Sequence, residues 1–300
     1  MFKGIILAVI GATSYGFQPV FTKLLINIGV TSNTLLVYRF IYILMIMGIY
    51  LIVTKRIVKP TKRQIIDLIL YGAIGYGGAI YLLAEAYLYM PMGQATMIHF
   101  TYPLFVTLYM VIFYKEKMTW VKAMALGMTC MSILLLMEFN FALNSFGVMI
   151  ALLSGMAFGA YMVSVSQSSI KEFDACNLMF YLSIVIILVF GIQGVITGDL
   201  VLFNLPAAAY GSMFSIALLS IIGIGFMTIS IRLIGPTYAA MISIFEPVVT
   251  LICGIIFFNE IVTIYSGLGS FLMIAVILLI AFESYLRKIK LERNKIEKRE

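Results

Sequence analysis

The sequence predicts an all-α membrane protein whose ten transmembrane helices form a 5+5 inverted repeat. The first observation is composition: 63% of the 300 residues are hydrophobic and 11% are charged, whereas a soluble domain carries roughly 25% charged residues. The second is length, because ten apolar runs approach the about 20 residues that cross a bilayer. The third is duplication: shifting the sequence by 144 positions places 95–120 on 239–264, with proline on proline and glutamate on glutamate.

The first five spans are expected at 3–27, 33–53, 64–90, 93–114 and 119–138. The connections between them are short and polar or marked by proline and glycine, so no soluble domain is inserted. The first and third spans are rich in glycine, which lets neighbouring helices approach closely. The fourth span contains a proline, which removes a backbone hydrogen bond and bends the helix.

The second five spans are expected at 146–168, 175–197, 206–230, 236–258 and 261–285. The sixth and seventh spans echo the first and second at an offset of 143, and the ninth matches the fourth at 144. Because five is odd, the second copy enters the membrane from the opposite side. Two inverted halves around a central site are a common construction of secondary transporters.

The expected domains are therefore a first repeat at 1–138, an inverted second repeat at 146–285 and a basic cytoplasmic tail at 286–300. With the N-terminus inside, 18 of the 20 Lys and Arg residues fall in cytoplasmic segments. The positive-inside rule then places both termini in the cytoplasm. We expect a multi-pass protein of the plasma (inner) membrane.

Several short motifs follow one another in a specific order. Arg39 comes early in the second span, and a proline-bearing fourth span follows a short break. The longest motif runs from the ninth span into the next loop: Glu246, Pro247, Phe257, Phe258, Asn259, Glu260 and Thr263. This order resembles the EamA family of the drug/metabolite transporter superfamily, although the first repeat has Tyr102-Pro103 in place of Glu-Pro. The resemblance implies a transporter of amino acids, other small metabolites or drugs, mostly outward.

Three prolines inside apolar runs are expected to bend their helices: Pro19, Pro103 and Pro247. Pro103 and Pro247 each lie about 15 Å into their spans at 1.5 Å per residue. That depth is near the bilayer middle, where inverted-repeat transporters bind substrate. A bend that serves packing alone is the alternative for each proline.

Three ionisable residues within the spans are candidates for coupling or charge recognition. Such a residue costs about 2.5–3.5 kcal/mol on insertion scales and is a functional hypothesis by default. Glu246 is a candidate to bind a proton, a cationic group or a basic residue. His99, the single histidine, either couples transport to protons or is a hydrogen-bonded core residue. Arg39 either meets a substrate carboxylate or pairs with Glu85.

Candidates for the cavity wall come from both repeats. The complete set of candidate substrate-binding residues is Tyr15, Gln18, Tyr81, Glu85, His99, Tyr102, Tyr161 and Ser243.

Glu85 supports an alternative function. It stands one helical turn from Tyr81, and a carboxylate beside tyrosines suits an ammonium group through charge and cation–π contact. This pocket would serve an importer of a small organic cation such as choline. Otherwise Glu85 is an interfacial residue paired with a basic side chain. Two loop glutamates, Glu116 and Glu260, are expected to be structural residues beside the N-cap threonines Thr119 and Thr263.

Other classes of function fit the sequence poorly. An intramembrane enzyme would need a catalytic set, and the chain has one histidine, no HExxH motif and no aspartate deep in a span. We therefore expect no catalytic residues, cofactor or metal site. The basic residues lie at span ends, which argues against nucleic acid. The expected partners are a small-molecule substrate, the lipid bilayer and, as a candidate, a second copy of the chain. The prediction is a secondary-active exporter of an amino acid or similar metabolite working by alternating access.

Overall fold

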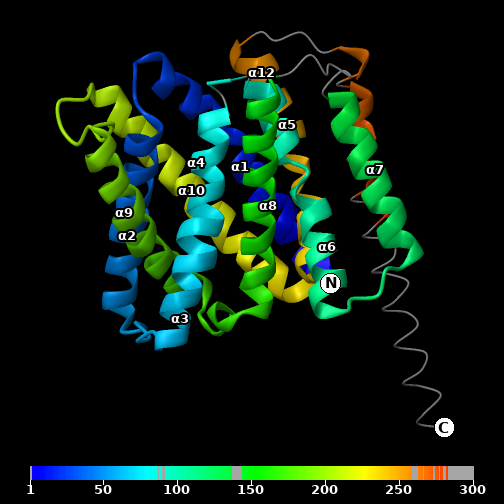
Figure 1. The fold of residues 1–300 in the computed structure, drawn as a ribbon, viewed down its shortest axis with the longest axis horizontal. Coiled ribbons are helices and arrows are strands. Elements are labelled where there is room, and N and C mark those ends of the chain that lie inside the picture. The colour runs from blue at the N-terminus through cyan, green and yellow to red at the C-terminus, as the bar shows by residue number, and fades with distance from the viewer. Residues whose placement is uncertain are drawn as a thin grey trace.

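A computed structural model describes residues 2–86, 88–89, 92–136, 144–258, 263–265, 267–272, 274–276, 278–279 and 282. Within these ranges the regular elements are helical and form one bundle (Figure 1). The helices of the first part are α1 Phe2–Asn27, α2 Ser32–Thr54, α3 Lys62–Asp67, η1 Leu68–Gly77, α4 Gly78–Ala86, α5 Met92–His99, α6 Tyr102–Tyr114 and α7 Trp120–Leu136. Those of the second part are α8 Ser145–Gln167, η2 Ser169–Glu172, α9 Ala175–Thr197, α10 Ala207–Ile234, α11 Pro236–Ser243 and α12 Phe245–Phe258.

Eight of the ten predicted spans are confirmed as helices that are long and apolar enough to cross a membrane. The fifth predicted span corresponds to a shorter apolar helix, Trp120–Leu135. The tenth contains the short apolar helix Gly267–Val276, and much of its predicted range lies outside the described residues. The chain is therefore an integral membrane protein that crosses the bilayer several times.

The third span is one continuous helix with an unusual middle. The segments α3, η1 and α4 follow each other directly, and η1 is a π-helix over Leu68–Gly77. Two of its glycines allow α9 to approach. A Cβ on Gly72 would lie 2.7 Å from Leu182, and one on Gly77 would lie 2.7 Å from Phe190. A π-helical turn changes which side chains share a face, and such turns are frequent at functional sites.

The helix packing has a matching plan in the two halves. In the second half, α8 packs against η1, α4, α5 and α6 of the first half. In the first half, α1 packs against α10, α11 and α12 of the second half. The first span of each half therefore contacts the third and fourth spans of the other half. The second spans of the two halves, α2 and α9, pack along each other.

One end of the bundle carries the start of α1, α3 and η2, and we call it the N-terminal end (Figure 1). At the opposite end, Thr34 in the first turn of α2 binds the loop that follows α9. Its Oγ1 donates to the carbonyl of Asp199 at 3.2 Å and accepts from the backbone N–H of Val201 at 2.9 Å. We call this set of three residues the Thr34 clamp.

The N-terminal end carries the equivalent set. Asn177, in the first turn of α9, donates from Nδ2 to the carbonyl of Arg56 at 3.0 Å and accepts at Oδ1 from the backbone N–H of Val58 at 3.1 Å. These three residues, the Asn177 clamp, each lie 143 positions from their counterparts in the Thr34 clamp. The start of each helix thus meets the end of the other, so α2 and α9 run antiparallel.

Candidate functional site

Two helix breaks lie at equivalent positions of the two halves. The break between α5 and α6 falls at residues 100–101, and that between α11 and α12 falls at Ile244, 144 positions after Phe100. Pro103 and Pro247 both lie in the first turn of the following helix, where the missing N–H costs no intrahelical bond. Just before each proline, where a bend was expected, the helix is thus interrupted for one or two residues, although Thr101 and Ile244 keep right-handed backbone angles. Pro19 lies inside α1, which continues without a break.

The breaks bring four of the predicted residues together. His99 and Ser243 end α5 and α11, whereas Tyr102 begins α6 and Glu246 follows one residue into α12. Ser243 is the positional counterpart of His99, and Glu246 that of Tyr102. The Tyr102 hydroxyl and Ser243 Oγ share a hydrogen bond between the two halves. The two breaks therefore meet inside the bundle.

His99 is enclosed by α8. Its Nδ1 shares a hydrogen bond of 2.6 Å with Ser154 Oγ, and its ring lies 5.4 Å from that of Phe158. Phe158 also packs edge-on against Tyr102, with ring centroids 4.8 Å apart. The imidazole is 9% exposed. This is the hydrogen-bonded environment expected of a core histidine, which lies nevertheless beside the break.

Arg39 lies in the bundle interior and is 6% exposed. One guanidinium nitrogen, Nη2, donates to the Tyr76 hydroxyl at 3.0 Å. The Tyr76 ring in turn lies 4.8 Å from the ring of Tyr161 on α8. The expected pairing of Arg39 with Glu85 is therefore replaced by a contact with Tyr76, a residue not predicted for the site.

Glu246 places a carboxylate close to this group. It lies within electrostatic range of the Arg39 guanidinium and of the Tyr102 hydroxyl. It is partly buried, and among the described residues its carboxylate has neither a hydrogen bond nor an ion pair. A positive and a negative group thus face the same interior region without neutralising each other in direct contact.

Two further predicted residues on α1 line the same region. Tyr15 lies beside Tyr76 and interacts electrostatically with Arg39, and its ring contacts the position where a Cβ on Gly223 would stand. Gln18 is buried, and its Nε2 donates to Ser220 Oγ at 3.4 Å. Both therefore face α10, as expected of residues between the halves.

The Tyr81 and Glu85 pair forms a separate group. Tyr81 packs on Phe190 of α9, with ring centroids 5.7 Å apart, and interacts with Glu85, Gln193 and Asp199. None of the described contacts of Tyr81 or Glu85 reaches the two helix breaks. The structure therefore does not join this pair to the group around Arg39.

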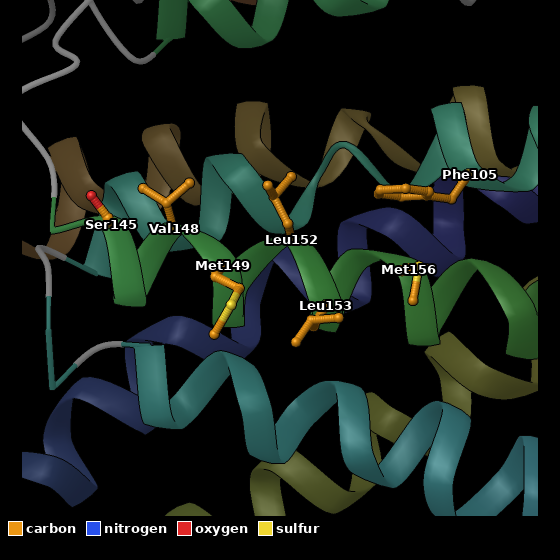
Figure 2. A pocket seen from close by; sticks show the side chains of 7 residues that line it. All are labelled: Phe105, Ser145, Val148, Met149, Leu152, Leu153 and Met156. Carbon is orange, nitrogen blue, oxygen red and sulfur yellow. The ribbon is translucent and has the colours of Figure 1, made fainter.

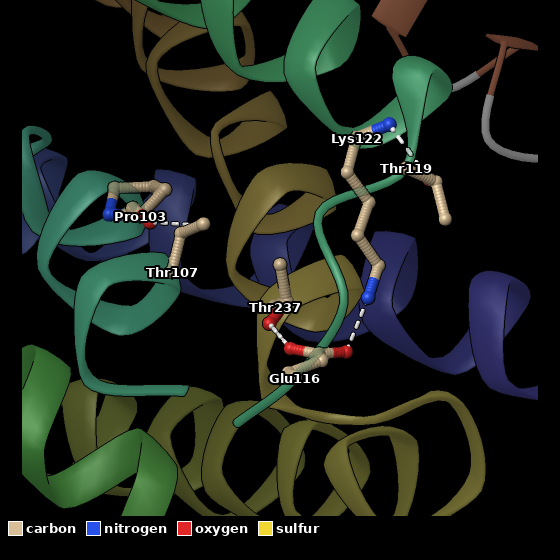
Figure 3. Close-up of polar contacts among 6 residues, drawn as sticks. All are labelled: Pro103, Thr107, Glu116, Thr119, Lys122 and Thr237. Atoms are coloured by element: carbon tan, nitrogen blue, oxygen red, sulfur yellow. Dashed lines mark hydrogen bonds and ion pairs between the residues drawn. The ribbon is translucent and has the colours of Figure 1, made fainter. Parts of the chain in front are cut away.

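Glu116 has a different contact from the one expected. It forms an ion pair with Lys122 of α7, and it accepts a hydrogen bond of 2.7 Å from Thr237 at the start of α11 (Figure 3). Thr119 does accept a hydrogen bond of 3.3 Å from the backbone of Lys122, as an N-cap would. Because Thr237 belongs to the second half, Glu116 links the two halves and is more than a loop carboxylate.

An apolar groove runs along the outer face of α8 (Figure 2). Its lining residues are Phe105, Ser145, Val148, Met149, Leu152, Leu153 and Met156. Such a lining suits hydrocarbon and offers little to a polar metabolite. Ser154 and Tyr161, which contact His99 and Tyr76, are not among these lining residues, so the candidate substrate site is the interior group.

Three interior residues were missed by the sequence reasoning: Tyr76, Ser154 and Phe158. A signal existed for the last two, because Ser154, Phe158 and Tyr161 recur at the spacing of one helix face. Tyr76 could not be found in this way. Counting back from Glu85 at α-helical spacing selects Tyr81 for the interior face, whereas the π-helical segment η1 changes which side of the helix Tyr76 lies on.

The fold and interior site define a helical membrane protein with two similarly built halves. Comparison with known proteins narrows this class. The sequence matches the EamA-like transporter family over residues 2–138 and again over 145–282. The chain therefore belongs to this family, which is part of the drug/metabolite transporter superfamily.

Two further comparisons, one with curated protein sequences and one with solved structures, add information on the fold alone. No curated protein sequence gives a significant match. A solved structure titled "Crystal structure of protein" is similar, with a TM-score of 0.73 and 12% identity over 92% of this chain and 96% of its own. At this identity the similarity describes the fold and carries no information about substrate.

Proposed function

We propose that this protein is a secondary-active carrier that moves a small metabolite, such as an amino acid, outward across the plasma membrane by alternating access. The observation that supports this most is the meeting of two broken helices through Tyr102 and Ser243. In secondary transporters, discontinuous helices at the interface of two repeats bind the substrate near the bilayer midplane.

The proposal includes a 5+5 inverted repeat with both termini in the cytoplasm. The antiparallel packing of α2 and α9, with one clamp at each end, supports it. The equivalent breaks at Pro103 and Pro247 support it as well. In this arrangement the N-terminal end of the bundle is cytoplasmic, and the substrate site lies between Arg39, Glu246 and the Tyr102–Ser243 contact.

A zwitterion fits this site by charge. A guanidinium binds a carboxylate through two parallel hydrogen bonds, and a carboxylate accepts hydrogen bonds from an ammonium group. Arg39 and Glu246 offer these two groups within electrostatic range of each other. An organic cation alone would leave Arg39 without a counter-charge, which disfavours the choline alternative at this site.

The test is exchange of radiolabelled amino acids in proteoliposomes of purified protein. Tyr102→Phe and Ser243→Ala should each lower exchange, because each removes the hydrogen bond between the halves. If Glu246 or His99 carries a coupling proton, Glu246→Gln or His99→Ala should abolish pH-driven accumulation while exchange persists. Glu85→Gln is the matched control, because its carboxylate lies outside the interior group.

Two results would contradict the proposal. One is amino acid flux no greater than in protein-free liposomes, together with uptake of labelled choline that Glu85→Gln abolishes. The other is accumulation in right-side-out vesicles but not in inside-out vesicles, which would reverse the direction.

A further inference from the structure

Two arginines extend into the bundle with donors that lack partners. The Nε of Arg39 is buried without a hydrogen bond among the described residues, and so are Nε and Nη2 of Arg232 on α10. A buried donor left without a hydrogen bond is unfavourable, and more so when the group is charged. The described part of the chain therefore leaves both guanidinium groups with unused binding capacity.

Two tyrosines connect the arginines. Arg232 interacts electrostatically with Tyr161, whose ring lies 4.8 Å from that of Tyr76. The Tyr76 hydroxyl accepts the hydrogen bond of 3.0 Å from Arg39. The four side chains come from α10, α8, η1 and α2, and we call them the row.

The row leads from the N-terminal end of the bundle to the central site. Arg232 lies in the last turn of α10, and Ser230 Oγ donates to the carbonyl of Gly4 near the start of α1 at 2.7 Å. Tyr161 lies within the last two turns of α8, whereas Arg39 lies two turns into α2 from the opposite end. One arginine is therefore near the N-terminal end and the other is deep in the bundle.

The acidic groups that face the row do not pair with the arginines directly. Asp174 is within electrostatic range of Arg232, but its carboxylate accepts hydrogen bonds from the backbone and side chain of Asn177. Glu246 on α12 is within range of Arg39 only. Each arginine thus has one carboxylate within range, but among the described residues neither guanidinium forms a direct ion pair, so its buried donors without partners are free to bind an anion.

We propose that Arg232 and Arg39 are two successive binding positions for an anionic group, a carboxylate or a phosphate, of the transported molecule. The group binds Arg232 first and then Arg39, moving along Tyr161 and Tyr76 between the N-terminal end and the central site. Guanidinium groups bind both anions in a bidentate manner. The inference rests on the proposed carrier function and restricts its substrates to molecules with an acidic group.

Binding of matched probes to the purified protein tests the anionic requirement. The probes are L-leucine against L-leucinamide, 4-methyl-2-oxopentanoate against its methyl ester, and glycerol 3-phosphate against glycerol. At least one acid should raise the melting temperature while its uncharged or cationic counterpart does not. Arg39→Gln should abolish that shift, Arg39→Lys should retain part of it, and the exposed Arg63→Gln should leave it unchanged. The pair that responds identifies the group as a carboxylate or a phosphate.

Arg232 is tested by kinetics and by stability. Arg232→Gln should lower the initial rate of exchange of the stabilising acid by about tenfold or more, since it removes charge-assisted hydrogen bonds, while the saturating melting shift persists. Without any probe, Arg232→Met should melt at or above the wild-type temperature, because an unpaired guanidinium is replaced by an apolar side chain. A lower melting temperature would show that Arg232 is structural.

The remaining outcomes also decide the question. The inference is overturned if no acid shifts the melting temperature, if the counterparts act equally well, or if exchange in Arg232→Gln is unchanged. Exchange of leucinamide as fast as leucine would leave the carrier function standing and remove the anionic requirement. Arg39-dependent binding of an oxo acid or phosphate, without amino acid flux, would support the inference and refute the amino acid proposal.

Discussion

Replacing Gly155 by alanine should destabilise the contact between α8 and the break at α5 and α6. A Cβ at this position would lie 2.8 Å from the carbonyl oxygen of His99 and 3.3 Å from Thr101 Oγ1. The first of these atoms belongs to the backbone, so it cannot move aside as a side chain would. Overpacking of this kind costs about 1–3 kcal/mol, and it would displace His99 from Ser154.

Gly191→Ala is the matched control for this prediction. Gly191 also lies inside a helix, α9, but a Cβ there would meet nothing within 4 Å. Alanine favours both helices over glycine by about 1 kcal/mol, and this gain cancels when the two variants are compared. Gly155→Ala should therefore be less stable than Gly191→Ala by about 1–3 kcal/mol. The measurement is thermal unfolding of the two purified proteins in one detergent. Equal melting temperatures would refute the packing described at the break.

Three further predictions concern the links between the halves. Glu116→Gln should destabilise the protein by about 1–3 kcal/mol because Lys122 is left buried without a counter-charge, and adding Lys122→Met should recover most of the loss; an unchanged melting temperature in the single variant would contradict this. Thr34→Val and Asn177→Leu should each lower the free energy of unfolding by about 1–2 kcal/mol. The two losses should add in the double variant, since the clamps lie at opposite ends of the bundle. A double variant as stable as either single variant would argue against independent clamps. Tyr102→Phe should slow exchange while changing stability by no more than about 1.5 kcal/mol, and wild-type exchange would exclude a role for its hydroxyl.

Much of the fold could be predicted from hydropathy and from the duplication. Apolar runs alone locate the eight long helices, because a membrane-spanning segment needs a minimum length. The paired prolines, Pro103 and Pro247, located the two breaks because a proline cannot continue the hydrogen bonding of the turn before it. Pro19 shows the limit of that reasoning, since α1 continues through it. Sequence alone does not show whether neighbouring helices tolerate the bend.

The site was predictable where side chains follow helical periodicity. His99, Tyr102, Ser243 and Glu246 were found because they flank the duplicated prolines. The interior face of the third span was not, because η1 is π-helical and brings Tyr76 to Arg39. The link made by Glu116 was also missed, since Thr237 is 121 positions away. Contacts of that separation depend on packing that periodicity does not encode.

The two clamps indicate which parts of the bundle stay together in the proposed cycle. In an inverted-repeat carrier, each half takes up the conformation of the other half when the carrier turns over. A contact that both halves already make in one state is therefore also present in the other state. The Thr34 and Asn177 clamps form the same hydrogen bonds in one structure, so exchange leaves α2, α9 and their loops joined. The Lys122–Glu116 ion pair differs, because the sequence has a serine, Ser266, at the position that corresponds to Lys122, and a serine cannot form an ion pair. Motion is therefore expected at the two helix breaks and at the Glu116 link.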